Sequence, residues 1–277
     1  MKKISVIMSV YNNEKTVRRA IDSIINQSFN NLELIICDDN SSDNTFKILE
    51  EYKNKYNNIK IFRNEKNMGL AYSLNKCIEL SQGEYIARQD GDDYSVENRL
   101  IKQFNFLEEN KEYDFVGSNV YLFDENGIWG ERIFLEKPEK QDFLRMDFNN
   151  GARFCHPSIM FRKKALLEIG KYRVAKETRR GQDYDLYMRM YAKGMKGYNI
   201  QEKLLYYYEG EQSLKRIPFN HRINSVIIRY KGFKELGLLP IGLLVVLKPI
   251  FVGLLPKKVI RLYKKLKYSY KKNNRGE

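Results

Sequence analysis

Glycine, proline, cysteine and histidine are all scarce in this 277-residue chain. Its 17 glycines and 6 prolines are too few for a collagen-like or low-complexity protein. The three cysteines, Cys37, Cys77 and Cys155, are odd in number and lie within or beside apolar runs, so we expect reduced thiols in the cytosol. With only two histidines, no Cys/His zinc site can be assembled at the usual ligand spacing. Any metal must therefore be held by carboxylates.

The common phosphate-binding loops are also missing. No Walker-type GxxxxGK(S/T) segment occurs, and the turn after the first apolar run, SVYNNEKT, contains no glycine. A GxGxxG loop needs glycines there so that the backbone can approach a pyrophosphate. Dinucleotide-binding and P-loop functions are therefore excluded. The first apolar run, residues 4–10, is short and lacks a small-residue cleavage site, so we expect a strand there and not a signal peptide.

Positive charge is concentrated near the C-terminus. The net charge of the chain is +14, and residues 257–277 hold nine basic residues and one acidic residue. The preceding residues 237–256, GLLPIGLLVVLKPIFVGLLP, have Lys248 as their single charge and are long enough to span a bilayer. Three prolines and the central lysine disfavour a spanning helix. We therefore expect in-plane or re-entrant association with an anionic membrane surface, with a span or a soluble core segment as alternatives.

Apolar runs typical of buried strands alternate with helical patterns in the first part of the chain. We predict strands at residues 4–10, 32–37, 59–62 and 85–88. This alternation predicts an α/β fold with a mostly parallel sheet flanked by helices. Beyond about residue 120 the alternation is lost. There we expect a strand at 154–161, a helix at 183–192 and an aromatic edge strand at 204–208.

Carboxylates follow two of the predicted parallel strands. Asp38 and Asp39 come after the second strand, and Asp90, Asp92 and Asp93 come after the fourth. In open parallel sheets, ligands bind beyond the carboxyl ends of the strands. Three carboxylates within four residues repel one another unless a cation joins them, and hard oxygen ligands suit Mg²⁺ or Mn²⁺. The alternative is ordinary turn chemistry, with the carboxylates favoured at the start of a helix.

Five motifs follow one another along the chain: SVIMSVYNNEKTVRRAIDSIINQSF, LELIICDDNSSDNT, NMGLAYSLNKCIELSQGEYIARQDGDD, HPSIMFRK and GQDYDLYMR. The chain, over about residues 4–208, resembles the family 2 glycosyltransferases with the GT-A fold, in particular bacterial enzymes that build capsular, exopolysaccharide or O-antigen chains. The resemblance implies inverting transfer of a hexose or N-acetylhexosamine from a nucleotide-diphosphate sugar, most often a UDP-sugar, to an acceptor hydroxyl, with Mn²⁺ or Mg²⁺ as cofactor. We expect a lipid-linked or saccharide acceptor at the cytoplasmic face of the cell membrane.

The resemblance also implies roles for residues of the first motifs. Ser9 and Tyr11 match the segment that lines the uracil pocket, and Asp39 matches the residue that accepts a hydrogen bond from the base. Asp90 matches the acid on the ribose side of the donor. Asp92 and the adjoining Asp93 match the ligands of the metal that bridges the diphosphate, and either can be the closer ligand.

Later motifs supply the candidate base. Asp183 matches the general base of the family, although the usual acidic neighbour is Gln182 here. His156 falls in a segment that the family places near the donor sugar, but a structural histidine with a satisfied hydrogen bond is an equally good interpretation. Asp185 lies four residues before Arg189, a spacing that favours a surface ion pair, so we assign it a structural role.

One departure from the family pattern concerns an arginine. Family members commonly have an arginine near the position of Leu74. A contact to the donor phosphate or ribose is therefore expected from Arg63, from Arg88 or from the loop at residues 176–180.

Three units follow from this organisation. We predict that residues 1–120 form a nucleotide-sugar-binding half and that residues 121–220 form the acceptor-side half of the same catalytic domain. Residues 221–277 are expected to form a membrane-associating segment, first apolar and then basic.

Two other functions were weighed against this one. A sugar-phosphate nucleotidylyltransferase also uses an aspartate-held Mg²⁺, but it needs a glycine-rich, arginine-containing loop after the first strand, and SVYNNEKT lacks one. A nucleic-acid-binding protein would spread lysine and arginine over a folded face with interleaved aromatic residues. Here the strand ends are acidic and the basic tail adjoins an apolar run. We therefore expect no nucleic-acid partner.

Overall fold

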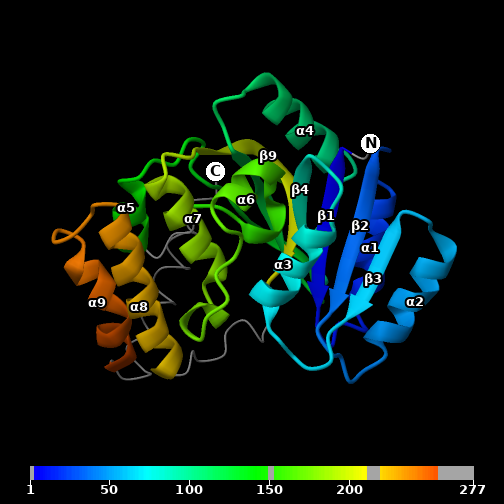
Figure 1. Cartoon of the computed structure of the whole chain (residues 1–277), viewed down its shortest axis with the longest axis horizontal. Coiled ribbons are helices and arrows are strands. Elements are labelled where there is room, and N and C mark those ends of the chain that lie inside the picture. The colour runs from blue at the N-terminus through cyan, green and yellow to red at the C-terminus, as the bar shows by residue number, and fades with distance from the viewer. Residues whose placement is uncertain (1–2, 149–152, 211–218, 255–277) are drawn as a thin grey trace.

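The computed structural model describes residues 3–148, 153–210 and 219–254. Within these residues nine strands form one mixed sheet in the order β3-β2-β1-β4-β8-β6-β9-β5, with β7 paired to β6. Helices lie against both faces of the sheet (Figure 1). The predicted α/β class is confirmed.

The first four strands are parallel neighbours, as the alternating pattern predicted. They are β1 (Ile4–Val10), β2 (Leu32–Asp38), β3 (Ile59–Arg63) and β4 (Tyr85–Asp90). The helices that connect them are α1 (Val17–Ile25), α2 (Thr45–Lys55) and α3 (Leu70–Leu80). Because β1 and β2 are buried on both faces, their sequences are almost continuously apolar.

The other strands extend the sheet in mixed directions. They are β5 (Tyr94–Ser95), β6 (Phe115–Asp124), β7 (Gly127–Arg132), β8 (Met160–Arg162) and β9 (Gly197–Tyr208). β8 is antiparallel to β4 and β6, and β9 is parallel to β6. Two predictions are corrected here. The segment 154–161 is not one strand, because a 3₁₀ helix at His156–Ser158 precedes β8. Residues 204–208 are no edge strand, because β9 lies between β6 and β5.

The remaining helices follow β5 in the chain. They are α4 (Arg99–Glu109), α5 (Asp142–Phe148), α6 (Lys163–Glu168), α7 (Gln182–Ala192), α8 (Phe219–Glu235) and α9 (Leu243–Leu254), with a 3₁₀ helix at Glu177–Arg179. The helix predicted at 183–192 is confirmed.

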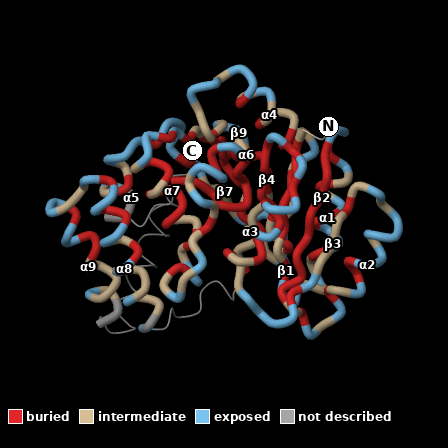
Figure 2. Tube along the Cα trace, viewed as in Figure 1, coloured by how far each residue is buried: buried red, intermediate tan, exposed pale blue. Residues whose placement is uncertain are grey.

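Two apolar cores hold the helices on the sheet. Val6 and Met8 of β1 pack on one face with residues of α1, α2 and α4. Ile7 points to the other face, where α3, α6, α7 and α8 contribute side chains. The central strands are accordingly buried along most of their length (Figure 2). The three cysteines are buried and free, as expected. Because β1, β2 and β4 are parallel, their carboxyl ends meet at one edge.

The C-terminal helices α8 and α9 are packed on the domain. Phe233, Leu236 and Val246 are buried in the core that includes α7. Other apolar side chains face outward, and Ile241 and Leu244 are the most exposed of these, at 81% and 77%. In the described ranges no helix has both the length and the apolarity to cross a membrane. The predicted basic tail, residues 257–277, lies outside the described residues.

The first testable prediction concerns Gly83, which lies against β1. A Cβ at Gly83 would come within 2.6 Å of the backbone nitrogen of Ser5 and 2.8 Å of the carbonyl carbon of Ile4. Neither atom can move without shifting β1, so Gly83→Ala should lower the free energy of unfolding by about 1–3 kcal/mol, the usual cost of overpacking. Chemical denaturation measures this. Gly130→Ala is the matched control, because its Cβ would meet Leu122 at an ordinary 3.7 Å. Equal effects of the two variants would contradict the prediction.

Candidate functional site

The carboxyl ends of the parallel strands open into a cavity of about 510 Å³. Strand register places Ser9 of β1 opposite Cys37 of β2 and Asp90 of β4. The cavity is lined by Ser9, Val10, Tyr11, Asn13, Asp39, Asn67, Gly69, Leu70, Asp90, Gly91, Asp92, Arg179, Arg180 and His221. The structure therefore brings Ser9, Tyr11, Asp39, Asp90 and Asp92 together, although they come from three segments of the sequence.

An acidic cluster lies at one wall of this cavity, which two of its members, Asp90 and Asp92, line. Asp90, Asp92 and Asp93 each offer a carboxylate oxygen, and these oxygens lie within 4.8 Å of one another. Burial and the charge of Asp90 raise the pKa of Asp92 to about 6. Burial, Asp90 and Asp92 raise the pKa of Asp93 well above its usual range. The folded protein therefore pays in stability for holding these carboxylates ionised close together.

The buried end of the cluster fits a divalent cation. Asp93 is 1% exposed, and its Oδ1 accepts a hydrogen bond from the backbone N–H of Tyr208 at 2.7 Å. Its Oδ2 is buried and has no hydrogen-bond partner in the part of the chain that the structure describes. An orphaned carboxylate oxygen beside two further carboxylates is a donor set for a hard cation such as Mg²⁺ or Mn²⁺. Asp92 and Asp93 are the residues that could hold it.

One buried arginine compensates part of this negative charge. Arg88 of β4 is 1% exposed, and its Nη2 lies 2.5 Å from Oδ1 of Asp90. The pair holds the Asp90 carboxylate in place, whereas Asp92 and Asp93 form no ion pair within the described residues. Arg88 does not line the cavity. It therefore acts on the site through Asp90.

The other two expected sources of an arginine contact, Arg63 and the loop at 176–180, differ in whether they line the cavity. Arg63 lies 3.0 Å from Oδ2 of Asp38 and donates to the carbonyl of Ser41, so it braces the loop around Asp39 and does not itself line the cavity. Arg179 and Arg180 belong to the loop at 176–180 and do line the cavity. Of the three sources considered for a phosphate contact, this loop is the one that the structure places at the site.

Asp39 lines the cavity and also stabilises a neighbouring loop. Its Oδ1 accepts hydrogen bonds from Asn64 Nδ2 at 2.7 Å and from the N–H of Met68 at 2.8 Å, and its Oδ2 accepts from the N–H of Gly69 at 2.8 Å. Gly69 has φ +89°, a conformation that favours glycine. Asp39 thus holds the loop that supplies Asn67 to the cavity, and its hydrogen bond to a base stays a prediction.

Asp183 and Asp185 stand one half-turn apart on α7 and have different surroundings. Burial raises the pKa of Asp183, the Tyr184 N–H and Arg88 oppose this rise, and Asp90 adds to it. Asp183 therefore lies within electrostatic reach of the Arg88–Asp90 pair, although it is not among the cavity-lining residues. Asp185 pairs with Arg189 at 2.8 Å. The expected ion pair exists, but Asp185 is 4% exposed, so the pair is buried and not at the surface.

His156 is not among the residues that line the cavity. Its Nε2 is 2.7 Å from the hydroxyl of Tyr172, and the ring is buried. Burial, with the charge of Arg88, holds the pKa of His156 well below its usual range, so the ring is neutral at physiological pH. This arrangement is that of a satisfied structural histidine. Its role in donor binding stays a prediction.

Sequence reasoning missed His221, the cavity residue furthest along the chain. It comes from the first turn of α8 and faces the same cavity as Tyr11 and Asp92. A lone histidine near the start of a helix carries no local signal of such a place. Only the packing of α8 beside the loop at 176–180 brings it to the site.

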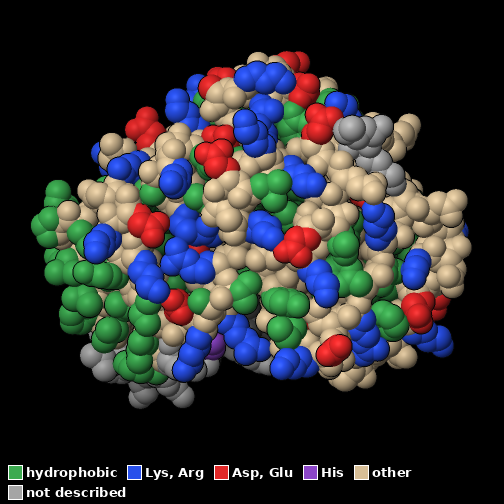
Figure 3. All heavy atoms as spheres, viewed as in Figure 1, with side chains coloured by type: hydrophobic (Ala, Val, Ile, Leu, Met, Phe, Trp, Pro, Cys, Tyr) green, Lys and Arg blue, Asp and Glu red, His purple; other side chains and the backbone are tan. Residues whose placement is uncertain are grey.

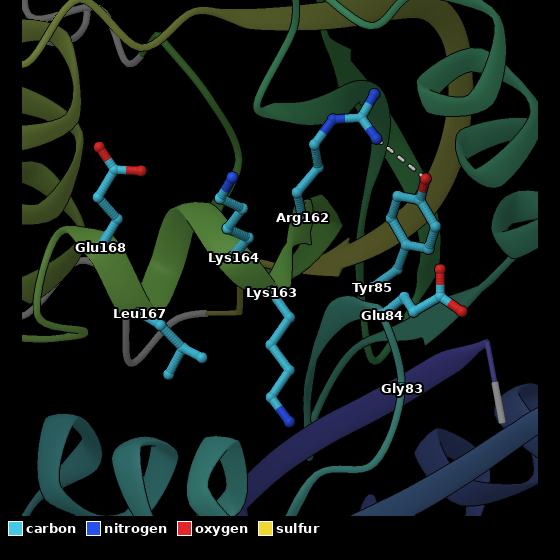
Figure 4. A pocket seen from close by; sticks show the side chains of 8 residues that line it. All are labelled: Gly83, Glu84, Tyr85, Arg162, Lys163, Lys164, Leu167 and Glu168. Atoms are coloured by element: carbon cyan, nitrogen blue, oxygen red, sulfur yellow. Dashed lines mark hydrogen bonds between the residues drawn. The ribbon is translucent and has the colours of Figure 1, made fainter. Parts of the chain in front are cut away.

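A second hollow, of about 720 Å³, lies at the opposite end of β4 (Figure 4). Two of its three basic side chains, Arg162 and Lys163, form hydrogen bonds within the protein. Arg162 donates to the hydroxyl of Tyr85 at 3.0 Å and to nearby carbonyls, and Lys163 donates to the carbonyl of Ser81 at 2.6 Å. These contacts fasten β8 and α6 to the sheet, so the hollow is explained by packing.

Comparisons with known proteins agree on one family. The model of "Glycosyl transferase family 2" matches residues 5–170. EpsE of Bacillus subtilis (strain 168), which carries a provisional glycosyltransferase name, is 40% identical over 264 residues, covering 95% of this chain and 93% of EpsE. The Escherichia coli UDP-Glc:alpha-D-GlcNAc-diphosphoundecaprenol beta-1,3-glucosyltransferase WfaP is 29% identical over 235 residues, covering 84% of this chain and 88% of WfaP. S. aureus TarS 1–349, solved in complex with UDP-GlcNAc, shares the fold with a TM-score of 0.67 and 22% identity, covering 83% of this chain and 66% of that one.

The second prediction is that Asp93→Asn stabilises the metal-free protein. Asparagine keeps the acceptor for Tyr208 and removes one crowded charge. A carboxyl whose pKa is raised by folding destabilises the fold once it is ionised, so its removal should raise the thermal midpoint at neutral pH. We expect a rise of several degrees in EDTA, since about 1 kcal/mol corresponds to roughly 2–4 °C for a domain of this size.

Adding Mn²⁺ completes the test. Binding to the folded state alone should raise the midpoint of the unsubstituted protein and raise that of Asp93→Asn much less. Differential scanning fluorimetry in EDTA and in Mn²⁺ measures both effects. A lower midpoint for the variant in EDTA, or an unchanged gain from Mn²⁺, would show that Asp93 is not a crowded metal ligand.

Proposed function

Because the chain belongs to glycosyl transferase family 2 and has the GT-A fold, we propose that it transfers a sugar from a UDP-sugar to the hydroxyl group of an acceptor, with inversion at the anomeric carbon. One observation carries the proposal. Asp90 and Asp92 of the acidic cluster line the same cavity as Ser9 and Tyr11, and Asp93 is buried beside them, so one cavity offers a wall for a base and a wall for a diphosphate.

The donor would lie across the mouths of the parallel strands. Tyr11, half exposed, offers a ring face for uracil beside Ser9 and Asp39. Asp90 would contact the ribose side, while Arg179 and Arg180 offer positive charge to the diphosphate. Two of the relatives support this donor class, because WfaP is named for UDP-Glc and TarS was solved with UDP-GlcNAc.

Asp92 and Asp93 would hold Mn²⁺ or Mg²⁺ through the oxygens described above. When bound, such an ion supplies positive charge to the diphosphate as it leaves. The acidic wall then attracts a donor that it would otherwise repel. Arg88 remains beneath Asp90 and holds that carboxylate in place.

Asp183 is proposed as the general base of a single displacement. The acceptor oxygen forms a bond to the anomeric carbon while the bond from that carbon to the diphosphate oxygen breaks, and Asp183 takes the hydroxyl proton. Burial raises the pKa of Asp183, which makes it a stronger base than a solvated aspartate, and the charge of Arg88 opposes part of that rise. Attack from the face opposite the leaving group inverts the configuration, as in inverting glycosidases.

A lipid-linked saccharide is the proposed acceptor, in the synthesis of a cell-surface polysaccharide at the cytoplasmic face of the membrane. The name of WfaP gives a diphosphoundecaprenol-linked GlcNAc as its acceptor. Residues 121–220 would form the acceptor-side half and residues 1–120 the donor half. His156 would act from below the donor sugar through Tyr172.

The third prediction tests the reaction itself. The full chain, incubated with Mn²⁺ and a panel of UDP-sugars, should release UDP and glycosylate a lipid-diphosphate saccharide. Asp90→Asn and Asp92→Asn should abolish transfer and weaken Mn²⁺-dependent binding of UDP. The control is Asp22→Asn, which changes a carboxylate of α1 that accepts a hydrogen bond from the hydroxyl of Tyr52. This variant should transfer sugar normally. Transfer that persists in both cavity variants would refute the metal assignment, and retention of configuration in the product, seen by NMR, would refute inversion.

The fourth prediction separates the two aspartates of α7. Asp183→Asn should leave UDP affinity near normal and lower turnover by roughly 10²-fold to 10⁴-fold, the range for a lost general base. Asp185→Asn should lower the free energy of unfolding, because it leaves the buried charge of Arg189 without its partner, by about 3–5 kcal/mol. Single-turnover kinetics at low temperature and chemical denaturation measure the two effects. If Asp185→Asn lost as much turnover as Asp183→Asn while still folded, the base assignment would fail.

A further inference from the structure

We propose that the outer face of α8 and α9 docks on an anionic lipid bilayer. The inference deepens the proposed function by naming the surface that meets the membrane, and it rests on that function only for the lipid-linked acceptor. Four observations carry it: an outward apolar stripe, the segregation of positive charge, the absence of a spanning helix among the described residues, and the contacts of α8 with the donor cavity.

The first observation is an apolar stripe on helices that are already packed. The inner face of α8 is buried against α7, α9 packs on α8 and α5, and the outward side chains of both helices are also apolar. Successive intervals of four, four and three residues keep the exposed positions of α8 on one side of the helix. The outer apolar face consists of Phe219, Ile223, Ile227, Tyr230, Ile241, Leu243, Leu244 and Phe251. Figure 3 shows hydrophobic side chains gathered over α8 and α9. Such contiguous exposure marks an interaction surface.

The distribution of basic and acidic residues indicates what kind of partner this face would bind. Residues 1–210 contain 33 basic and 32 acidic side chains, whereas residues 219–277 contain 14 basic and 2 acidic ones. Arg222, Lys231 and Lys248 belong to the same two helices as the apolar face. Apolar side chains among cations suit the headgroup region of an anionic leaflet, where each lysine or arginine adds about 1 kcal/mol. A second copy of this chain would instead bring two strongly positive segments together.

The mode of attachment follows from the fold. The helices α8 and α9 are short and packed on the domain, and no described helix could cross the bilayer. Ile241 and Leu244 project most, so the turn before α9 and its first turn would enter the leaflet first. The protein would lie on the membrane and not pass through it, as the sequence led us to favour.

The docking helix is also part of the site. His221 of α8 lines the donor cavity, two residues before Ile223 of the outer face. Lys231 pairs with Glu177 at 2.6 Å, and Asn224 donates to the carbonyl of Lys176 at 3.3 Å. These contacts hold the loop that carries Arg179 and Arg180. Docking would thus place the donor cavity beside the headgroups, where a lipid-linked hydroxyl can reach it.

The test uses the full chain and vesicles of neutral lipid or of neutral lipid mixed with phosphatidylglycerol. Sedimentation should show binding to the anionic vesicles, weakening with salt. Leu244→Asp should weaken binding roughly tenfold or more, because burying a leucine side chain is worth about that much in affinity. Ile128→Asp is the control: its parent is likewise an exposed aliphatic side chain, at 57%, but lies on β7, and it should bind like the unsubstituted protein. Thermal midpoints check that both variants fold.

A tryptophan probe locates the face directly. The chain has one tryptophan, Trp129 of β7. Leu244→Trp in a Trp129→Phe background should be quenched by brominated lipids in anionic vesicles, and Trp129 of the unsubstituted protein should not. The proposal is overturned by equal binding to neutral vesicles, by an equal loss in Ile128→Asp, by stronger quenching of Trp129, or by self-association through Leu244 without vesicle binding.

Failure of this proposal can be told apart from failure of the proposed function. Asp92→Asn should lose transfer and still bind anionic vesicles normally. Leu244→Asp should lose vesicle binding, and its effect on transfer should appear with a lipid-linked acceptor in vesicles. A protein that binds vesicles but transfers no sugar would support the proposed docking face and refute the proposed sugar transfer.

Discussion

Crowded negative charge at the carboxyl end of β4 is the constraint on which the site depends. Asp90, Asp92 and Asp93 face one another, and Arg88 pairs with Asp90 from below. The raised pKa values of Asp92 and Asp93 reflect the free-energy cost of keeping these two carboxylates ionised without a cation. A divalent ion bound by these carboxylates would relieve that cost, whereas a diphosphate without the ion would add to it. If these residues bind the ion as proposed, stability and function are opposed at them.

The parallel sheet makes this crowding possible. Two apolar cores fix β1, β2 and β4 side by side, and register then brings Ser9 opposite Asp90. Asp39, which follows β2, also helps to shape the cavity, because its three hydrogen bonds hold the loop that closes it. The residues that would bind a donor are thus attached to rigid strand ends, which limits the reorganisation needed when the donor arrives.

The helices α8 and α9 have inner and outer faces with different surroundings. Their inner face completes the core and brings His221 to the cavity, while their outer face carries exposed apolar side chains. A helix with two such faces is stable on the domain and still able to bind elsewhere. Charge is nearly balanced over residues 1–210, so the excess of basic residues lies in the C-terminal part of the chain.

The sequence by itself determined the α/β class, the order of the parallel strands, and the position of Asp90, Asp92 and Asp93, because apolar periodicity and residues at strand ends are local features. Tertiary structure decided what distant segments do together. It made the Asp185–Arg189 pair buried, gave His156 the hydroxyl of Tyr172, and brought Arg179, Arg180 and His221 to the cavity. The places of Arg179, Arg180 and His221 depend on how α7 and α8 pack more than 80 residues after β4, and contacts at that separation leave no local pattern in the chain.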